Sequence, residues 1–238
     1  MAAGTLHGAN YYMGDDLLPS TTLNPKGYFE SKKIEQINEE ILAKVVPSRP
    51  RGQIGKLFFR ERPTRNLRWL ARVPVKTVIP PCEELKTRIE QAIAQEPFCY
   101  KDPRFCYTLP TWRPYLKNTV YLCVFRHPAS TASSIIKLYE KGKLEELKIN
   151  LNQAFEVWRL MYLHILQIHQ HQGDWLFMHY EQFFDQESLS KVEDFIEAKI
   201  DRQFPDLALK REKNYPKVAP QIAEVYQELC RLANFPIN

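Results

Sequence analysis

The chain has 238 residues, a formal charge of +5 at pH 7 and a hydrophobic content of 44%. This length suits one large domain or two small ones, and the composition excludes a disordered or fibrous protein. No apolar run approaches the roughly 20 residues that span a bilayer, and the first residues lack the basic and apolar regions of a secretory signal.

The cysteines and the charges indicate a cellular location and limit the kinds of binding partner. The five cysteines are scattered without a C-x-x-C pair, which favours reduced thiols and a cytoplasmic location. The net charge is mild, so no nucleic-acid partner is predicted. The most basic stretch, residues 49–72, is interpreted either as a solvated basic surface or as a rim that attracts a nucleotide cofactor or an acidic acceptor.

Periodicity and turn residues predict a chain of alternating helices and strands. Helices are predicted at residues 1–11, 30–43, 82–95, 129–141, 145–170, 187–198 and 217–234, with a short one within 64–73. Strands are predicted at residues 98–101, 105–109, 120–125 and 175–180. Strands separated by helices indicate an α/β fold with a parallel sheet flanked by helices.

We expect one domain over residues 1–238, with two irregular parts. Residues 46–81 hold six prolines and no clear period, and are predicted to be an irregular insertion. Residues 200–238 are expected to form a C-terminal helical part. No internal repeat is evident.

The segment YLCVFRHPASTASSIIKLYEKGK, residues 121–143, carries the clearest pattern. Arg126 follows an apolar strand, at the sheet edge where α/β proteins bind ligands. Pro128 suits the first turn of the next helix, whose N-terminus attracts anions. Ser130 and Ser134 share one face of that helix. These groups suit a phosphate monoester; alternatively, Arg126 pairs with a carboxylate and the serines cap the helix.

This spacing, with proline two residues and serine eight residues after the arginine, resembles the 3′-phosphate-binding segment of sulfotransferases. Further segments resemble the same family in the same order, so that the resemblance covers about residues 1–190. They are residues 14–42, 100–116 and 177–186. The resemblance implies the cofactor 3′-phosphoadenosine 5′-phosphosulfate (PAPS) and a parallel sheet like that of P-loop NTPases.

The glycine-rich loop that holds the phosphosulfate in this family has no counterpart in the sequence. GQIGK, residues 52–56, has the wrong spacing and follows no predicted strand. The start of the chain resembles the helix that comes after the loop. We therefore expect the first strand and the loop to be missing, either encoded upstream of Met1 or lost by truncation.

The resemblance also implies roles for individual residues. Glu30 is the first candidate for the catalytic base and Asp16 the second, although a carboxylate at a helix start also has a structural explanation. Lys101 is the candidate cation near the sulfate, with Lys26 a lesser candidate.

Each of these assignments has a plain structural alternative. Asp102 is placed to neutralise Lys101 or Arg104 in an ion pair. Tyr180 is expected near the adenine, or else in the core. Trp112 either lines the acceptor pocket or, as we favour, packs in the core.

Three histidines, His164, His169 and His171, have spacings of five and two, which do not share an α-helical face. They are interpreted as surface residues at a helix end, and no metal site is predicted.

Three functions are considered. The first is PAPS-dependent transfer of a sulfuryl group to a hydroxyl or amine of a small molecule, lipid, glycan or peptide. The second is a truncated, non-catalytic nucleotide-binding remnant or interaction domain. The third, a nucleotide kinase, is disfavoured because a Walker lysine and Mg²⁺ ligands are absent from the sequence. The oligomeric state is left open.

Overall fold

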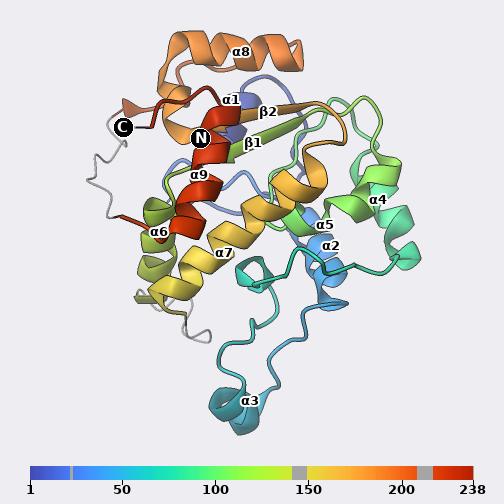
Figure 1. Ribbon diagram of the computed structural model, residues 1–238. Coiled ribbons are helices and arrows are strands. Elements are labelled where there is room, and N and C mark those ends of the chain that lie inside the picture. Colours follow the sequence, from blue (N-terminus) through green and yellow to red (C-terminus); the bar gives the residue numbers. More distant parts are fainter. Residues whose placement is uncertain (22–23, 141–148, 208–216, 238) are drawn as a thin grey trace.

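A computed structural model describes residues 1–21, 24–140, 149–207 and 217–237. The fold is mixed α/β, with a two-stranded parallel sheet and surrounding helices (Figure 1). The α/β class is thus confirmed. No helix in these residue ranges is long and apolar enough to cross a membrane.

The sheet pairs β1 (Tyr121–Phe125) with β2 (Trp175–His179) in parallel, with Phe125 opposite His179. Both strands were predicted. The connection between them contains α6 (Pro128–Glu140) and α7 (Leu151–His164). Two parallel strands need such a crossover because the end of the first strand and the start of the second lie at opposite edges of the sheet.

Further helices surround this unit and complete the chain in the described residues. They are α1 (Ala2–His7), α2 (Lys32–Ala43), α3 (Gly52–Phe58), α4 (Lys86–Ala92), α5 (Phe105–Trp112), α8 (Gln186–Ile196) and α9 (Pro220–Leu232). Short 3₁₀ segments lie at Arg68–Leu70, Glu83–Leu85, Arg113–Tyr115 and Tyr180–Phe184, and a π-helical segment at Ile165–His169. Most of the predicted helix ends agree within about four residues. The helix predicted at residues 145–170 is α7, which begins at Leu151 and continues into the π-helical segment, and residues 141–148 lie outside the described ranges.

Helices cover both faces of the sheet. Cys123 and Phe125 of β1 belong to a cluster with residues of α7 and α9. The alternate residues Leu122 and Val124 pack instead against a cluster from α1 and α8. This alternation follows from the two-residue period of a strand, and coverage of both faces explains why the strands are continuous apolar runs.

A second helical layer consists of α2, α4 and α5 (Figure 1). Ile34, Ile37 and Ile41 of α2 are fully buried against Ile89 of α4 and Trp112 of α5. The predicted apolar stripe on α2 is therefore the face that forms this core. Trp112 packs there, as the sequence favoured.

Two predicted strands are wrong. Residues 105–109 form the first turns of helix α5, and residues 98–101 contribute a single bridge, between Phe98 and Tyr12. In α5 five of the eight residues are buried, and its sequence FCYTLPTW is largely apolar. Such a short run does not distinguish a buried helix from a buried strand.

The histidine prediction is also wrong for two of the three residues. His164 and His169 are buried, and only His171 is exposed. Residues 165–169 form a π-helix, closed by a hydrogen bond from the Gln170 N–H to the Ile165 carbonyl. A spacing of five residues shares one face in a π-helix, so both histidines turn toward the protein interior.

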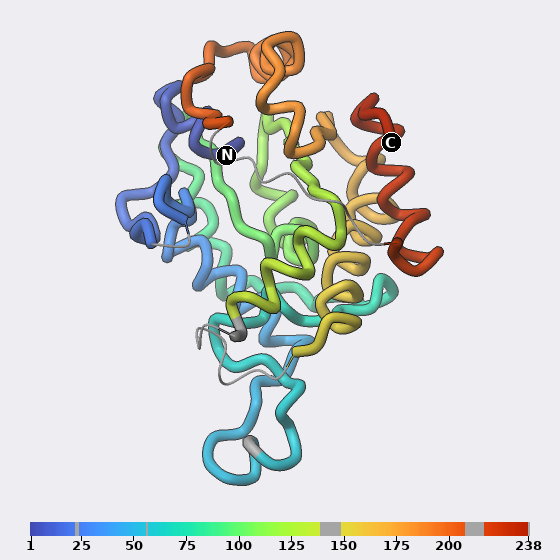
Figure 2. The backbone as a smooth tube through the Cα atoms, turned by 90° about the vertical axis from the view of Figure 1, so that its left-hand side faces the viewer, coloured from blue at the N-terminus to red at the C-terminus, as the bar shows by residue number. Residues whose placement is uncertain are grey.

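Residues 47–66 form an arm that projects from the body and carries α3 (Figures 1 and 2). It belongs to the predicted insertion, in which a helix was expected only at residues 64–73. Those residues contain instead the short 3₁₀ turn Arg68–Leu70.

Candidate functional site

Arg126 and Tyr180 lie side by side at the carboxyl edge of the sheet. Each follows its strand directly, and the register that sets Phe125 opposite His179 makes them neighbours. The guanidinium carbon of Arg126 is 4.8 Å from the centre of the Tyr180 ring. This distance is typical of a cation–π contact, so the parallel pairing of the strands holds the arginine in place.

The guanidinium of Arg126 has unused donor capacity. Its Nε is buried and has no hydrogen-bond partner, and no carboxylate of the described residues pairs with it. Buried donors are normally satisfied, and an unsatisfied one costs about 1–3 kcal/mol. The alternative that Arg126 serves a structural ion pair therefore has no support in the described residues, whereas an anion would satisfy this donor.

Ser130, in the first turn of α6, has a second unsatisfied group. The residue is buried and its Oγ has no partner. Ser134 is exposed, and its hydroxyl donates to the Ser130 carbonyl at 2.9 Å, one turn back on the same face. Neither serine caps the helix, contrary to the structural alternative.

The capping role belongs to His127, which the sequence analysis did not consider. Its Nδ1 accepts a hydrogen bond from the Ala129 N–H at 3.2 Å, and its ring contacts Tyr226 edge-on. Burial lowers the pKa of His127, which favours the neutral ring that accepting at Nδ1 requires. The signal in the sequence was a polar residue directly before Pro128 at a helix start.

These groups make the start of α6 suited to a negative ligand. The helix has 13 residues, and its N-terminus carries a partial positive charge. The Arg126 guanidinium and the Ser130 hydroxyl add a full charge and a further donor. A phosphate monoester accepts such bonds through three oxygens.

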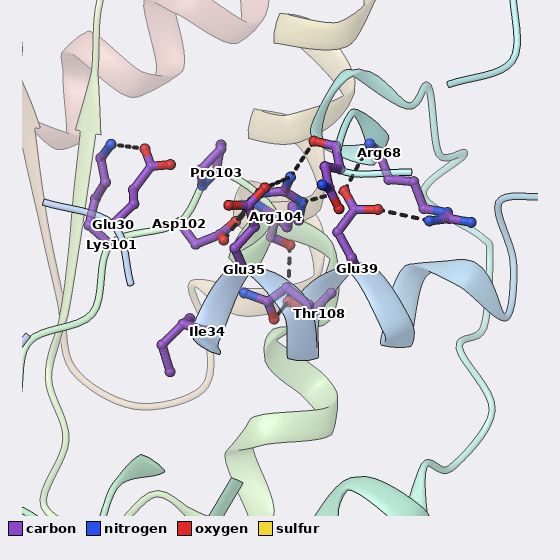
Figure 3. A network of polar contacts seen from close by, with 12 residues as sticks. Glu30, Ile34, Glu35, Glu39, Arg68, Lys101, Asp102, Pro103, Arg104 and Thr108 are labelled. Carbon is purple, nitrogen blue, oxygen red and sulfur yellow. Dashed lines mark hydrogen bonds and ion pairs between the residues drawn. The ribbon is translucent and has the colours of Figure 1, made fainter. Parts of the chain in front are cut away.

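The two candidate catalytic residues, Glu30 and Lys101, contact each other (Figure 3). Lys101 Nζ donates to Glu30 Oε1, with 45% of the lysine side chain and 13% of the glutamate side chain exposed. Within the described ranges, no hydrogen bond or ion pair joins this pair to Arg126 or Ser130. The structure thus forms two separate groups from the predicted site residues.

The secondary candidates hold loops in place. Asp16 accepts hydrogen bonds from Ser31 Oγ at 2.7 Å and from the Lys33 N–H at 2.8 Å, at the start of α2. Lys26 Nζ donates to the Phe204 carbonyl at 2.7 Å and lies 3.4 Å from Asp206. Both have structural partners.

A buried charge network lies next to the Glu30–Lys101 pair (Figure 3). Arg104 donates to Glu39 at 2.8 Å and lies 3.2 Å from Asp102, so Asp102 pairs with Arg104 rather than with Lys101. Glu35 also accepts from Arg104, at 3.1 Å, and desolvation is the main cause that raises the Glu35 pKa. The pair of Asp102 with Arg104 was one of the two alternatives given from the sequence. Sequence spacing gave no sign of Glu35 and Glu39, because α2 lies far from Arg104 in the chain.

Comparison of the chain with family models, with curated proteins and with solved structures finds no match. The described residues hold no group of three or more His, Cys, Asp or Glu side chains that could bind a metal ion.

Proposed function

We propose that the chain binds PAPS through its 3′-phosphate at the start of α6 and acts as a sulfotransferase. The observation that carries this proposal is the pair of buried, unsatisfied donors, Arg126 Nε and Ser130 Oγ, at a helix start that follows a parallel strand. A sheet of this kind suits the expected relation to P-loop NTPases. The five cysteines are free, which supports the proposed cytoplasmic location.

In this proposal each residue of the carboxyl edge has a role. Arg126 forms a forked pair with the 3′-phosphate, and Ser130 donates a further hydrogen bond. Ser134 exchanges its bond to the Ser130 carbonyl for one to the phosphate. Tyr180 holds the guanidinium by its ring and contacts the adenine.

Sulfuryl transfer also requires a base for the acceptor and a cation near the leaving oxygens. We assign the base to Glu30 and the cation to Lys101. Their contact supports a shared location, and it means that the acceptor must enter between them before Glu30 can take a proton. The acceptor is a hydroxyl or amine of a small molecule, lipid, glycan or peptide.

Calorimetry with two nucleotides tests the phosphate site. Adenosine 3′,5′-bisphosphate has the 3′-phosphate, and 5′-AMP lacks it. Replacing Arg126 with Met removes charge-assisted hydrogen bonds, so Arg126→Met should weaken binding of the bisphosphate about tenfold to hundredfold. Binding of 5′-AMP should change by less than about threefold.

The matched control is Arg88→Met, which removes an arginine from an ion pair with Glu40 on the other helical layer. This variant should bind both nucleotides as the wild type does. Because Arg126 Nε is unsatisfied, Arg126→Met should also unfold at a similar urea concentration to the wild type. Equal losses for both nucleotides, or no binding of the bisphosphate by the wild type, would contradict the proposal.

A binding-only protein is the second candidate, and the Glu30–Lys101 contact favours it because Lys101 occupies the Glu30 oxygen that would take the acceptor's proton. Transfer from 4-nitrophenyl sulfate to adenosine 3′,5′-bisphosphate releases nitrophenol and needs no natural acceptor. Release that Lys101→Ala abolishes would support the enzyme. Bisphosphate binding without nitrophenol release would support the binding-only protein.

A further inference from the structure

The arm formed by residues 47–66 exposes an apolar face to solvent. Ile54, Leu57 and Phe58 are 63%, 60% and 76% exposed. Their spacing of three and four residues places them on one side of α3. The other large exposed apolar residues of the described ranges are far from one another in the sequence. Scattered residues of that kind are ordinary, whereas a contiguous face marks an interaction site.

The same arm carries the whole excess charge of the protein. Residues 47–66 contain six Lys or Arg residues and one acidic residue, which leaves 27 basic and 27 acidic residues in the rest of the chain. The single acid, Glu61, pairs at 2.9 Å with Arg72, outside the arm. Arg51, Arg62 and Arg65 are exposed. The apolar face of α3 therefore lies in a basic stretch of the sequence, with exposed arginines before and after it.

A buried arginine anchors the base of the arm. Arg68 donates to the Val46 carbonyl at 2.9 Å and to Ser48 Oγ, and it pairs with Glu39 of α2 at 2.8 Å. A backbone hydrogen bond from the Arg49 N–H to the Pro63 carbonyl, at 3.1 Å, joins the two sides of the arm. The body thus holds the arm outward (Figures 1 and 2). Against the described residues, Ile54, Leu57 and Phe58 stay mostly exposed.

We propose that this arm docks the protein on the surface of an anionic phospholipid bilayer. Aliphatic and aromatic side chains on one side of a helix enter the boundary between headgroups and acyl chains, and flanking arginines attract the acidic headgroups. A nucleic acid would use the arginines but would leave Ile54 and Leu57 without partners, because bases are held by stacking and hydrogen bonds. This inference does not rest on the proposed sulfotransferase function.

Co-sedimentation with vesicles tests the proposal. The wild type should bind vesicles of phosphatidylcholine that contain roughly 30% phosphatidylserine, because this anionic lipid attracts basic segments. It should not bind vesicles of pure phosphatidylcholine. Binding should weaken as salt rises, because salt screens the attraction. Phe58→Ser should weaken binding about tenfold, since a large apolar side chain no longer inserts. The pair Arg51→Gln and Arg65→Gln should weaken it about tenfold as well.

The matched controls make the same kinds of substitution at residues outside the arm. Val78→Ser alters an equally exposed apolar residue outside the arm, and the pair Lys32→Gln and Lys86→Gln removes two exposed charges from other helices. Both should bind vesicles as the wild type does. Equal binding to neutral and anionic vesicles, unchanged binding of Phe58→Ser, or no vesicle binding by the folded wild type would overturn the proposal. The proposal would also be overturned if the wild type bound a single-stranded oligonucleotide more tightly than anionic vesicles and Phe58→Ser bound that oligonucleotide equally well.

Discussion

Two arginines of this protein lie in opposite surroundings. Arg104 is 2% exposed and meets three carboxylates, from Asp102, Glu35 and Glu39. Arg126 lies against the Tyr180 ring, and its buried Nε lacks a partner. An arginine like Arg104, whose guanidinium is paired with buried carboxylates, supports the fold, because its removal leaves those carboxylates without a counter-charge. An arginine like Arg126, whose Nε–H has no partner, contributes little to the fold and keeps that donor for a ligand.

The largest expected effect is a loss of stability when Arg104 is replaced. Arg104→Ala should lower the free energy of unfolding by about 3–5 kcal/mol, because it leaves buried carboxylates unpaired. Urea denaturation followed by circular dichroism measures this change. If Arg104→Ala does not fold, Asp102→Asn weakens the same network while keeping the arginine, and should destabilise in the same direction.

The comparison variant is Arg88→Ala, which breaks the partly exposed pair with Glu40. It should cost less than about 1 kcal/mol, as surface pairs usually do. A loss in Arg104→Ala no larger than that in Arg88→Ala would show that the buried network does not support the fold.

Local patterns in the sequence predict much of the sheet and its edge. Both strands are apolar runs bounded by polar residues, and the helix after β1 begins at Pro128, one residue before the predicted start. Arg126 and Tyr180 were each placed at a strand end from the sequence. Only the register, with Phe125 opposite His179, makes them neighbours.

The remaining features depend on long-range packing or on irregular backbone, which local patterns do not encode. Apart from the nearby Asp102, the partners of Arg104 come from α2 and from the loop at Asn66, whose carbonyl lies 2.7 Å from the guanidinium. The predicted strand at residues 105–109 is a helix because its apolar residues find partners on several sides. The buried histidines follow from a π-helical turn, which sequence periodicity did not predict.

His169 provides the second prediction, since it is a buried base that has no acidic partner among the described residues. Its Nε2 lies 2.9 Å from the Cys106 carbonyl and its Nδ1 lies 3.4 Å from Arg113. Burial, with a smaller contribution from Arg113, lowers the pKa of His169 to about 4. The unfolded chain therefore binds this proton more readily than the folded chain. The stability is complete above pH of about 6.5 and is lost as the pH falls toward 4.

The expected loss is up to about 3 kcal/mol, from a shift of roughly two and a half pKa units. Urea denaturation at several pH values between 7 and 4.5 measures it. Glu35 and Asp102, whose pKa values are raised by burial, act in the opposite direction, so the wild type must be compared with His169→Gln. That variant should lose stability less steeply on acidification, while the exposed control His171→Gln should follow the wild type. Parallel curves for His169→Gln and wild type would refute the assignment.

The smallest expected effect concerns the Glu30–Lys101 pair, which lies beside the buried network but reaches the surface. Because 45% of the lysine side chain is exposed, water screens the attraction, and a double-mutant cycle with Glu30→Gln and Lys101→Met should give a coupling of about 0.2–1 kcal/mol. Urea denaturation of the four proteins supplies the cycle. A coupling above about 2 kcal/mol would place the pair with the buried network as a fold-supporting contact. A weak coupling leaves it free to open for an acceptor, as the proposed base requires.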